Sequence, residues 1–194
     1  MVENPKPGRP RRYDISPVIG FANPSAAYAA AMLDELLERL LDLIVDLGQP
    51  ALEYVPPGAT NSIAMLVIHM AWAEASWIST ATGIEIPADL EQRLEPGKQA
   101  PSGDLPPVST SLDRLTSLCY DVRQQVTRPA LAAVSDIDRQ VPDQDRTMTM
   151  RGVLMHLVWH WTYHSGQVGL LRRLWGEMRY KWTFDDPLGD PTWE

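Results

Sequence analysis

The stretch MRGVLMHLVWHWTYHSGQVGLLRRL, residues 150–174, has the apolar spacing of a long helix and carries three of the four histidines in the chain. We predict a helix over about 149–177, on which His156, His160 and His164 follow one another at steps of four. At 100° per residue, His156 and His164 lie about 40° to either side of His160. The stripe they share contains residues expected to face the core, namely Val153, Leu157, Gln167, Val168 and Leu171. Buried imidazoles cost about 1–3 kcal/mol each unless they find partners.

Apolar periodicity predicts three further helices, at about 25–47, 60–82 and 111–133. The segment 83–108 contains five prolines and three glycines, so we expect a long crossover there, with one short helical turn at about 88–93. No segment shows the alternation of a half-buried strand. The sequence therefore predicts an all-α protein, a four-helix bundle with a long crossover between the second helix (60–82) and the third (111–133).

End signals support the proposed helix limits. Pro24 precedes the first helix and Gly48 follows it, as expected for an N-terminal proline and a C-terminal glycine. Thr60 or Asn61 would cap the second helix by accepting a bond from a free backbone N–H. Within the third helix, Pro129 is expected to introduce a kink or a division.

Composition restricts the class of protein. The 194 residues are 44% hydrophobic and carry a net charge of −8, with no basic stripe, which argues against nucleic-acid binding. No apolar run has the length of a membrane span, and the first residues show no signal peptide. The single cysteine, Cys119, excludes an internal disulfide and favours a cytoplasmic location. Fourteen arginines against three lysines hint at a GC-rich bacterial genome.

The fourth histidine, His69, faces the core from the second predicted helix, among several small residues. Two histidines four apart can reach one metal ion at about 2.0–2.1 Å, and a third from a facing helix completes a three-nitrogen set. Three protein ligands with open positions are typical of a catalytic metal site. The residues alone leave a second interpretation open, in which these are core histidines bonded to backbone carbonyls.

Other enzyme classes fit the sequence poorly. Position 157 is Leu and position 161 is Trp, so the H-E-x-x-H motif of zinc proteases is missing. No histidine has a glutamate three residues before it, as a di-iron bundle requires. A haem bundle held by two histidines is a further alternative, but three convergent imidazoles suit a small ion better.

Two of these helices resemble those of the DinB/YfiT-like superfamily of bacterial four-helix bundles. TNSIAMLVIHMAWAEASWI, 60–78, resembles its second helix, and 150–174 resembles its last helix with the H-x-x-x-H-x-G-Q signature. LEYVPPGATNSI matches the loop that leads into the second helix. The likeness covers about 25–175 and divides the chain into an N-terminal extension (1–24), the bundle (25–177) and a C-terminal tail (178–194). It departs from the signature at Ser165, where the family has arginine.

The resemblance implies a divalent metal ion, zinc or nickel, held by His69, His160 and His164. It also implies an up-down-down-up bundle that is often dimeric. His156 falls outside this triad, so we interpret it as a residue that supports a ligand from behind or lines the cavity. The alternative is that it replaces one of the two ligands on the same helix. Gln167, three residues after His164, is expected to hydrogen-bond a ligand or a bound water.

Four further residues receive structural interpretations. We expect Glu74 to face a neighbouring helix or solvent, and Cys119 to be a small core residue. Tyr163 is assigned to the side of the helix opposite His160. Trp159 and its apolar neighbours leave the last helix apolar nearly all round, which indicates either a homodimer or cover from the terminal tails.

Superfamily members of known activity resemble thiol-dependent transferases and isomerases that use mycothiol, bacillithiol or glutathione. The resemblance thus implies a metal-dependent S-transferase acting on a small molecule with a low-molecular-weight thiol. A metal-dependent hydrolase and a non-enzymatic metal-binding stress or interaction protein are the alternatives.

Overall fold

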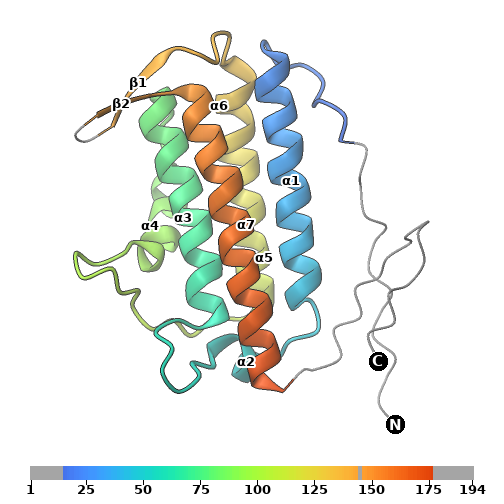
Figure 1. Cartoon of the computed structure of the whole chain (residues 1–194), viewed down its shortest axis with the longest axis vertical. Coiled ribbons are helices and arrows are strands. Elements are labelled where there is room, and N and C mark those ends of the chain that lie inside the picture. The colour runs from blue at the N-terminus through green and yellow to red at the C-terminus, as the bar shows by residue number, and fades with distance from the viewer. Residues whose placement is uncertain (1–14, 144–145, 177–194) are drawn as a thin grey trace.

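The computed structural model describes residues 15–143 and 146–176, and in this part of the chain it is a helical bundle with one small hairpin (Figure 1). The predicted all-α bundle is confirmed at this level. The long helices are α1 (Pro24–Ile44), α3 (Ile63–Thr82), α5 (Leu112–Val122) and α7 (Met150–Trp175). The short elements are α2 (Gln49–Glu53), α4 (Ala88–Leu94), the single turn η1 (Glu95–Gly97), and strands β1 (Gln140–Asp143) and β2 (Arg146–Thr149).

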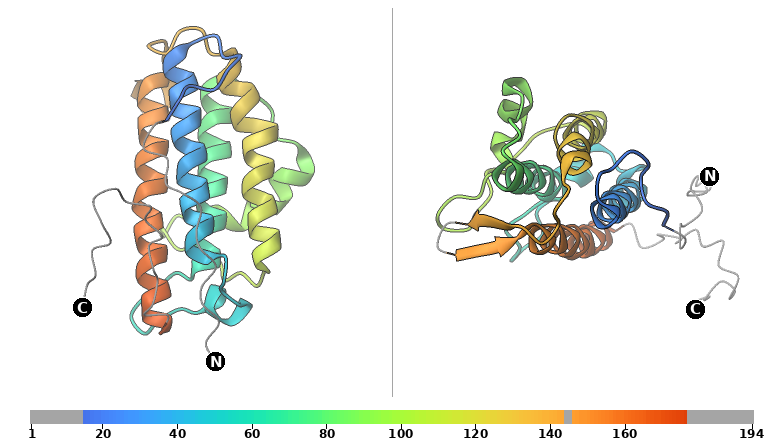
Figure 2. Two further views of the ribbon diagram at one scale, coloured as in Figure 1. Left: turned by 90° about the vertical axis from the view of Figure 1, so that its right-hand side faces the viewer. Right: turned by 90° about the horizontal axis from the view of Figure 1, so that it is seen from above.

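In the bundle, α7 packs against both α1 and α3, and α3 packs against α5 (Figure 2). In Figure 1, α3 ends at the top of the bundle and α5 begins at the bottom. The connection 83–111 therefore runs the length of the bundle. It carries α4 at the predicted helical turn, and η1 packs against α3.

The third predicted helix, 111–133, consists of three consecutive helical segments. α5 continues through a π-helical segment, η2 (Arg123–Thr127), into α6 (Arg128–Ala133), which confirms the division predicted near Pro129. In the wider π turn, the N–H of Arg128 bonds to the carbonyl of Arg123. Pro129 follows in the first turn of α6, where a missing N–H costs little.

Several local predictions were wrong. The cap of α3 is Ser62, whose hydroxyl accepts from the N–H of Met65 at 3.3 Å, so neither Thr60 nor Asn61 fills this role. α1 ends at Ile44, before Gly48, because the chain turns into α2. The hairpin was not foreseen, because strands of four residues are too short to show a clear alternation.

A buried ion pair crosses the core between α3 and η2. Arg123 Nη2 lies 3.0 Å from Glu74 Oε2, and Thr127 donates its hydroxyl to the same carboxylate. The guanidinium also lies 5.1 Å above the ring of Trp161 from α7. Burial raises the pKa of Glu74. Glu74 thus faces a neighbouring helix, which is one of the two placements predicted for it. Cys119 is a core residue, as predicted.

One helix among the described residues, α3, is long and apolar enough to cross a membrane by length and composition alone. Its most apolar window is 72% buried inside the bundle, which a core helix also shows, so this observation is weak evidence for a span.

Arg172 joins the end of α1 to α7, and we predict that Arg172→Met lowers the free energy of unfolding by about 2 kcal/mol. Arg172 is only 4% exposed, and its guanidinium donates to both carboxylate oxygens of Asp46 at 2.6 and 2.7 Å and to the carbonyl of Leu43. The variant leaves that carbonyl without its donor. Urea unfolding measures the effect.

The matched control is Arg151→Met, which breaks the exposed bidentate pair with Asp138. Exposed pairs contribute about 0–1 kcal/mol, so the control should unfold almost like the unmodified protein. Equal losses in the two variants would contradict the role assigned to Arg172.

Candidate metal centre

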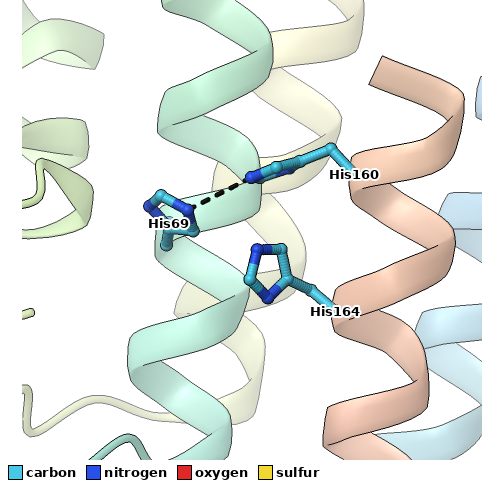
Figure 3. A group of neighbouring side chains, drawn as sticks. All are labelled: His69, His160 and His164. Atoms are coloured by element: carbon cyan, nitrogen blue, oxygen red, sulfur yellow. Dashed lines mark hydrogen bonds between the residues drawn. The ribbon is translucent and has the colours of Figure 1, made fainter. Parts of the chain in front are cut away.

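Three histidines meet between α3 and α7. His69 extends from the middle of α3, and His160 and His164 extend from successive turns of α7 (Figure 3). The Nε2 atoms of His69 and His160 are 3.2 Å apart. One ring nitrogen from each of the three residues lies within 4.8 Å of the others, which makes them a group able to hold a metal ion. The structure thus brings together the residues that the resemblance implied as ligands.

The ring of His69 is oriented by the crossover. Its Nδ1–H donates to the carbonyl of Gly97 at 2.9 Å, which leaves the Nε2 lone pair directed at α7. Position 97 has to be glycine, because a Cβ there would lie 2.5 Å from the carbonyl oxygen of Ile68 and 2.7 Å from Cβ of Trp72. Glycine therefore lets η1 approach α3 closely enough to supply the acceptor.

The ring of His164 is oriented from its own helix. Its Nδ1–H donates to Oε1 of Gln167 at 2.6 Å, so Nε2 is again the nitrogen left for a ligand. The predicted contact between Gln167 and a ligand residue is therefore present. A carbonyl or amide oxygen behind a ligating imidazole is the usual arrangement in metal sites, because it sets the tautomer and the ring orientation.

The site holds its imidazoles in the neutral form. Burial is the main cause that lowers the pKa of His69, His160 and His164. For His160 the neighbouring histidines add to burial, and its pKa falls to about 3. Its Nδ1 is buried and has no partner among the described residues. Neutral imidazole is the form that binds metal ions, so the site is prepared for this role before any ion arrives.

The donor set fits a first-row divalent ion. Two nitrogens of a tetrahedral ion with bonds of about 2.0–2.1 Å lie about 3.3 Å apart, close to the separation of Nε2 in His69 and His160. The group contains imidazoles alone, and imidazole suits zinc, nickel, copper and iron better than magnesium or calcium. Three ligands leave coordination positions for a substrate.

His156 lies beside this group without belonging to it. Its ring is 5.7 Å from that of His160 and 4.9 Å from the indole of Trp77 on α3. The position agrees with a residue that lines the site, and that role remains a prediction. Trp77 was not singled out in the sequence, although it projects from the same helix as His69 two turns later.

Tyr163 is not on the side of α7 opposite His160, and that assignment was wrong. Three residues correspond to 300° on a helix, which places Tyr163 about 60° from His160. Its ring lies 5.1 Å from that of His164 and 5.6 Å from that of Trp159. Tyr163 therefore borders the group of three histidines.

Comparison with known proteins agrees with this geometry. The model of the family described as mycothiol-S-transferase matches residues 29–176. The chain belongs to the mycothiol-S-transferase family. This confirms the resemblance to the DinB/YfiT-like superfamily, and the matched range contains all four histidines. No curated protein matches the chain.

Two solved structures have a fold similar to that of this chain. A conserved protein from Enterococcus faecalis is 18% identical with a TM-score of 0.64; the match covers 75% of this chain and 94% of that one. A DinB-like protein from Bacillus cereus is 19% identical with a TM-score of 0.56; the match covers 75% and 91%. At this identity the likeness supports the bundle and carries no information on activity.

Because the three histidines are neutral when folded, we predict that metal-free protein loses stability as the pH falls below about 6.5. In the unfolded chain they titrate near 6.5, whereas in the fold their pKa values are lower. As the pH falls, protons therefore bind first to the unfolded chain and stabilise it relative to the fold. The contribution of the three neutral histidines to the free energy of unfolding is complete above about pH 6.5 and is lost below it. Urea unfolding with a chelator between about pH 8 and pH 5 measures it.

His160→Gln should flatten this dependence, because it removes the histidine whose pKa is shifted furthest. The difference between the two proteins isolates the histidine from other groups, including Glu74, whose raised pKa acts in the opposite direction. Identical slopes in the two proteins would disprove the assignment.

Proposed function

We propose that this member of the mycothiol-S-transferase family binds one divalent ion, zinc or nickel, through His69, His160 and His164. We further propose that it joins mycothiol, or another low-molecular-weight thiol, through its sulfur to a small electrophile. The observation that carries the proposal is the convergence of three neutral imidazole nitrogens from α3 and α7. The family match supports the thiol as the co-substrate.

A divalent ion held by His69, His160 and His164 would supply Lewis acidity, which would favour the thiolate form of the co-substrate at neutral pH. The protein supplies the geometry. Gly97 and Gln167 orient the rings of His69 and His164, and the bundle keeps His160 away from bulk water. In the transfer, sulfur forms a bond to carbon, the leaving group departs with its bonding electrons, and the thiol proton passes to solvent.

The proposal also includes the topology of the bundle, the limits of its parts and the assembly of the protein. The scaffold would be an up-down-down-up bundle over 25–177, between an extension at 1–24 and a tail at 178–194. Residues 1–14 and 177–194 lie outside the part of the chain that the structure describes. We also propose that the protein is a cytoplasmic homodimer and that His156 lines the substrate side of the site.

Elemental analysis tests the metal. We predict about one equivalent of zinc or nickel per chain. Loss of one of three ligands should weaken metal binding by more than the 10–100-fold typical of outer contacts, so His69→Ala, His160→Ala and His164→Ala should each retain little metal after dialysis. His156→Ala is the matched control, since it removes a nearby imidazole outside the triad, and it should keep its ion. Full occupancy in His160→Ala would refute the assigned ligands.

Activity tests the transfer. We predict that metal-loaded protein accelerates the reaction of mycothiol with monochlorobimane at least about tenfold over the uncatalysed rate, and that His160→Ala does not. Chloride is the leaving group, and the fluorescent conjugate gives the readout. Metal-loaded protein that hydrolyses esters without conjugating the thiol would instead support the hydrolase. Bound metal without either activity would leave a non-enzymatic metal-binding protein.

A further inference from the structure

The buried ion pair in the core connects the two helices that carry the histidines. Its side chains, Arg123 of η2 and Glu74 of α3, are 3% and 0% exposed. The guanidinium of Arg123 lies over the indole of Trp161, which belongs to α7. Burial raises the pKa of Glu74, whereas Arg123, Thr127 and the indole of Trp161 lower it. The carboxylate of α3 thus interacts with both η2 and α7, and the four residues form one cluster that joins three helical segments.

This cluster is costly to bury. Within the described part of the chain, Nε and both Nη atoms of Arg123 are buried without a hydrogen-bond partner, and so is Oε2 of Glu74. Removing two charges from water costs more free energy than their attraction returns unless hydrogen bonds complete the pair. Apolar side chains of similar volume are often as stable as such a pair or more stable. Stability alone therefore does not explain why this chain has a buried arginine in its core.

A π-helical turn directs the cluster at α3. Arg123 and Thr127 are the first and last residues of η2, and both contact the carboxylate of Glu74. π-helical turns are rare, and they occur frequently at functional sites. The irregular turn and the incompletely bonded arginine are thus two separate departures from the most stable helix and core, and they meet at the same place, next to the helices of the histidines.

The cluster and the histidines hold the same two helices from different sides. Trp161 lies about 100° round α7 from His160, and Glu74 lies about 140° round α3 from His69. A planar guanidinium over an indole restricts the rotation of α7, because the contact is lost when the ring turns away. On a helix about 10–12 Å wide, a rotation of about 20° moves a side-chain nitrogen at the rim by about 2 Å. A metal–imidazole bond is itself only about 2.0–2.1 Å long, so this rotation decides whether His160 reaches an ion held by His69.

We propose that Arg123 is a positioning residue for the metal centre. Paired with Glu74 and stacked on Trp161, it holds α7 at the rotation that sets the 3.2 Å separation between Nε2 of His69 and Nε2 of His160. This inference rests on the proposed metal function and assigns control of the metal affinity to a residue outside the ligand set. Ligands that are held in place in advance lose less freedom when they bind, and their affinity is correspondingly higher.

The double variant Glu74→Gln, Arg123→Met tests this role, because it removes both charges and leaves no buried ion unpaired. Glutamine keeps an acceptor for Thr127 and methionine fills part of the arginine volume, so circular dichroism should show an intact fold. We predict that the variant binds zinc at least about tenfold more weakly than the unmodified chain, as loss of an outer contact typically does. The visible spectrum of the Co²⁺-loaded variant should change, because the ligand geometry changes. The matched control is Leu131→Ala, which removes a fully buried side chain from α6; it should lower stability and keep the zinc affinity within about twofold.

A second measurement needs no metal. With a chelator present, the hydrogen bond between the rings of His69 and His160 should give a protected imidazole N–H signal in NMR spectra of the full chain. The double variant should lose this signal, whereas the Nδ1–H of His69, which donates to the carbonyl of Gly97, should persist as an internal reference. Unchanged zinc affinity in the double variant, or a ring-to-ring signal that persists in it, overturns the role of Arg123 and leaves the proposed function intact. A full chain that binds no ion refutes the proposed function instead, and the imidazole signals still test the role of Arg123.

Discussion

The contact between the imidazoles of His69 and His160 is the constraint around which α3 and α7 are organised. Two basic nitrogens 3.2 Å apart in a buried place repel each other when both are protonated, and they are stable only as neutral rings. In the metal-free protein one ring donates to the other. When both accept, a cation has to lie between them. The pair is therefore satisfied either by a hydrogen bond between the two rings or by a cation that both rings would bind.

This arrangement needs rigid supports, and the chain supplies them from three directions. The crossover brings Gly97 against α3, where its carbonyl fixes the tautomer of His69. Arg123, held by Glu74, packs on Trp161, the residue after His160 in α7. Near the end of α7, Arg172 ties the helix to α1. Each support acts on the position or rotation of one of the two helices that carry the three histidines.

The different sides of α7 have different surroundings. One face fills the core, the adjoining edge carries His160 and His164, and the outer face is apolar and exposed in the single chain. The site and the outer face are joined through the rings of Trp159, Tyr163 and His164.

Local sequence rules were sufficient to predict the long helices and the side of each helix on which a histidine lies. Periodicity predicted the long helices within a few residues, and 100° per residue placed His69, His160 and His164 on core-facing stripes. The same arithmetic, correctly applied, also places Tyr163 beside the site. Gln167 could be predicted as a partner because it lies three residues from His164 on one helix. Tertiary structure alone decided the rest: which stripes face each other, that Gly97 meets His69 across 28 positions of chain, and that a buried arginine packs behind the site. Periodicity describes one helix at a time, whereas the distance between two imidazoles depends on how two helices are packed together.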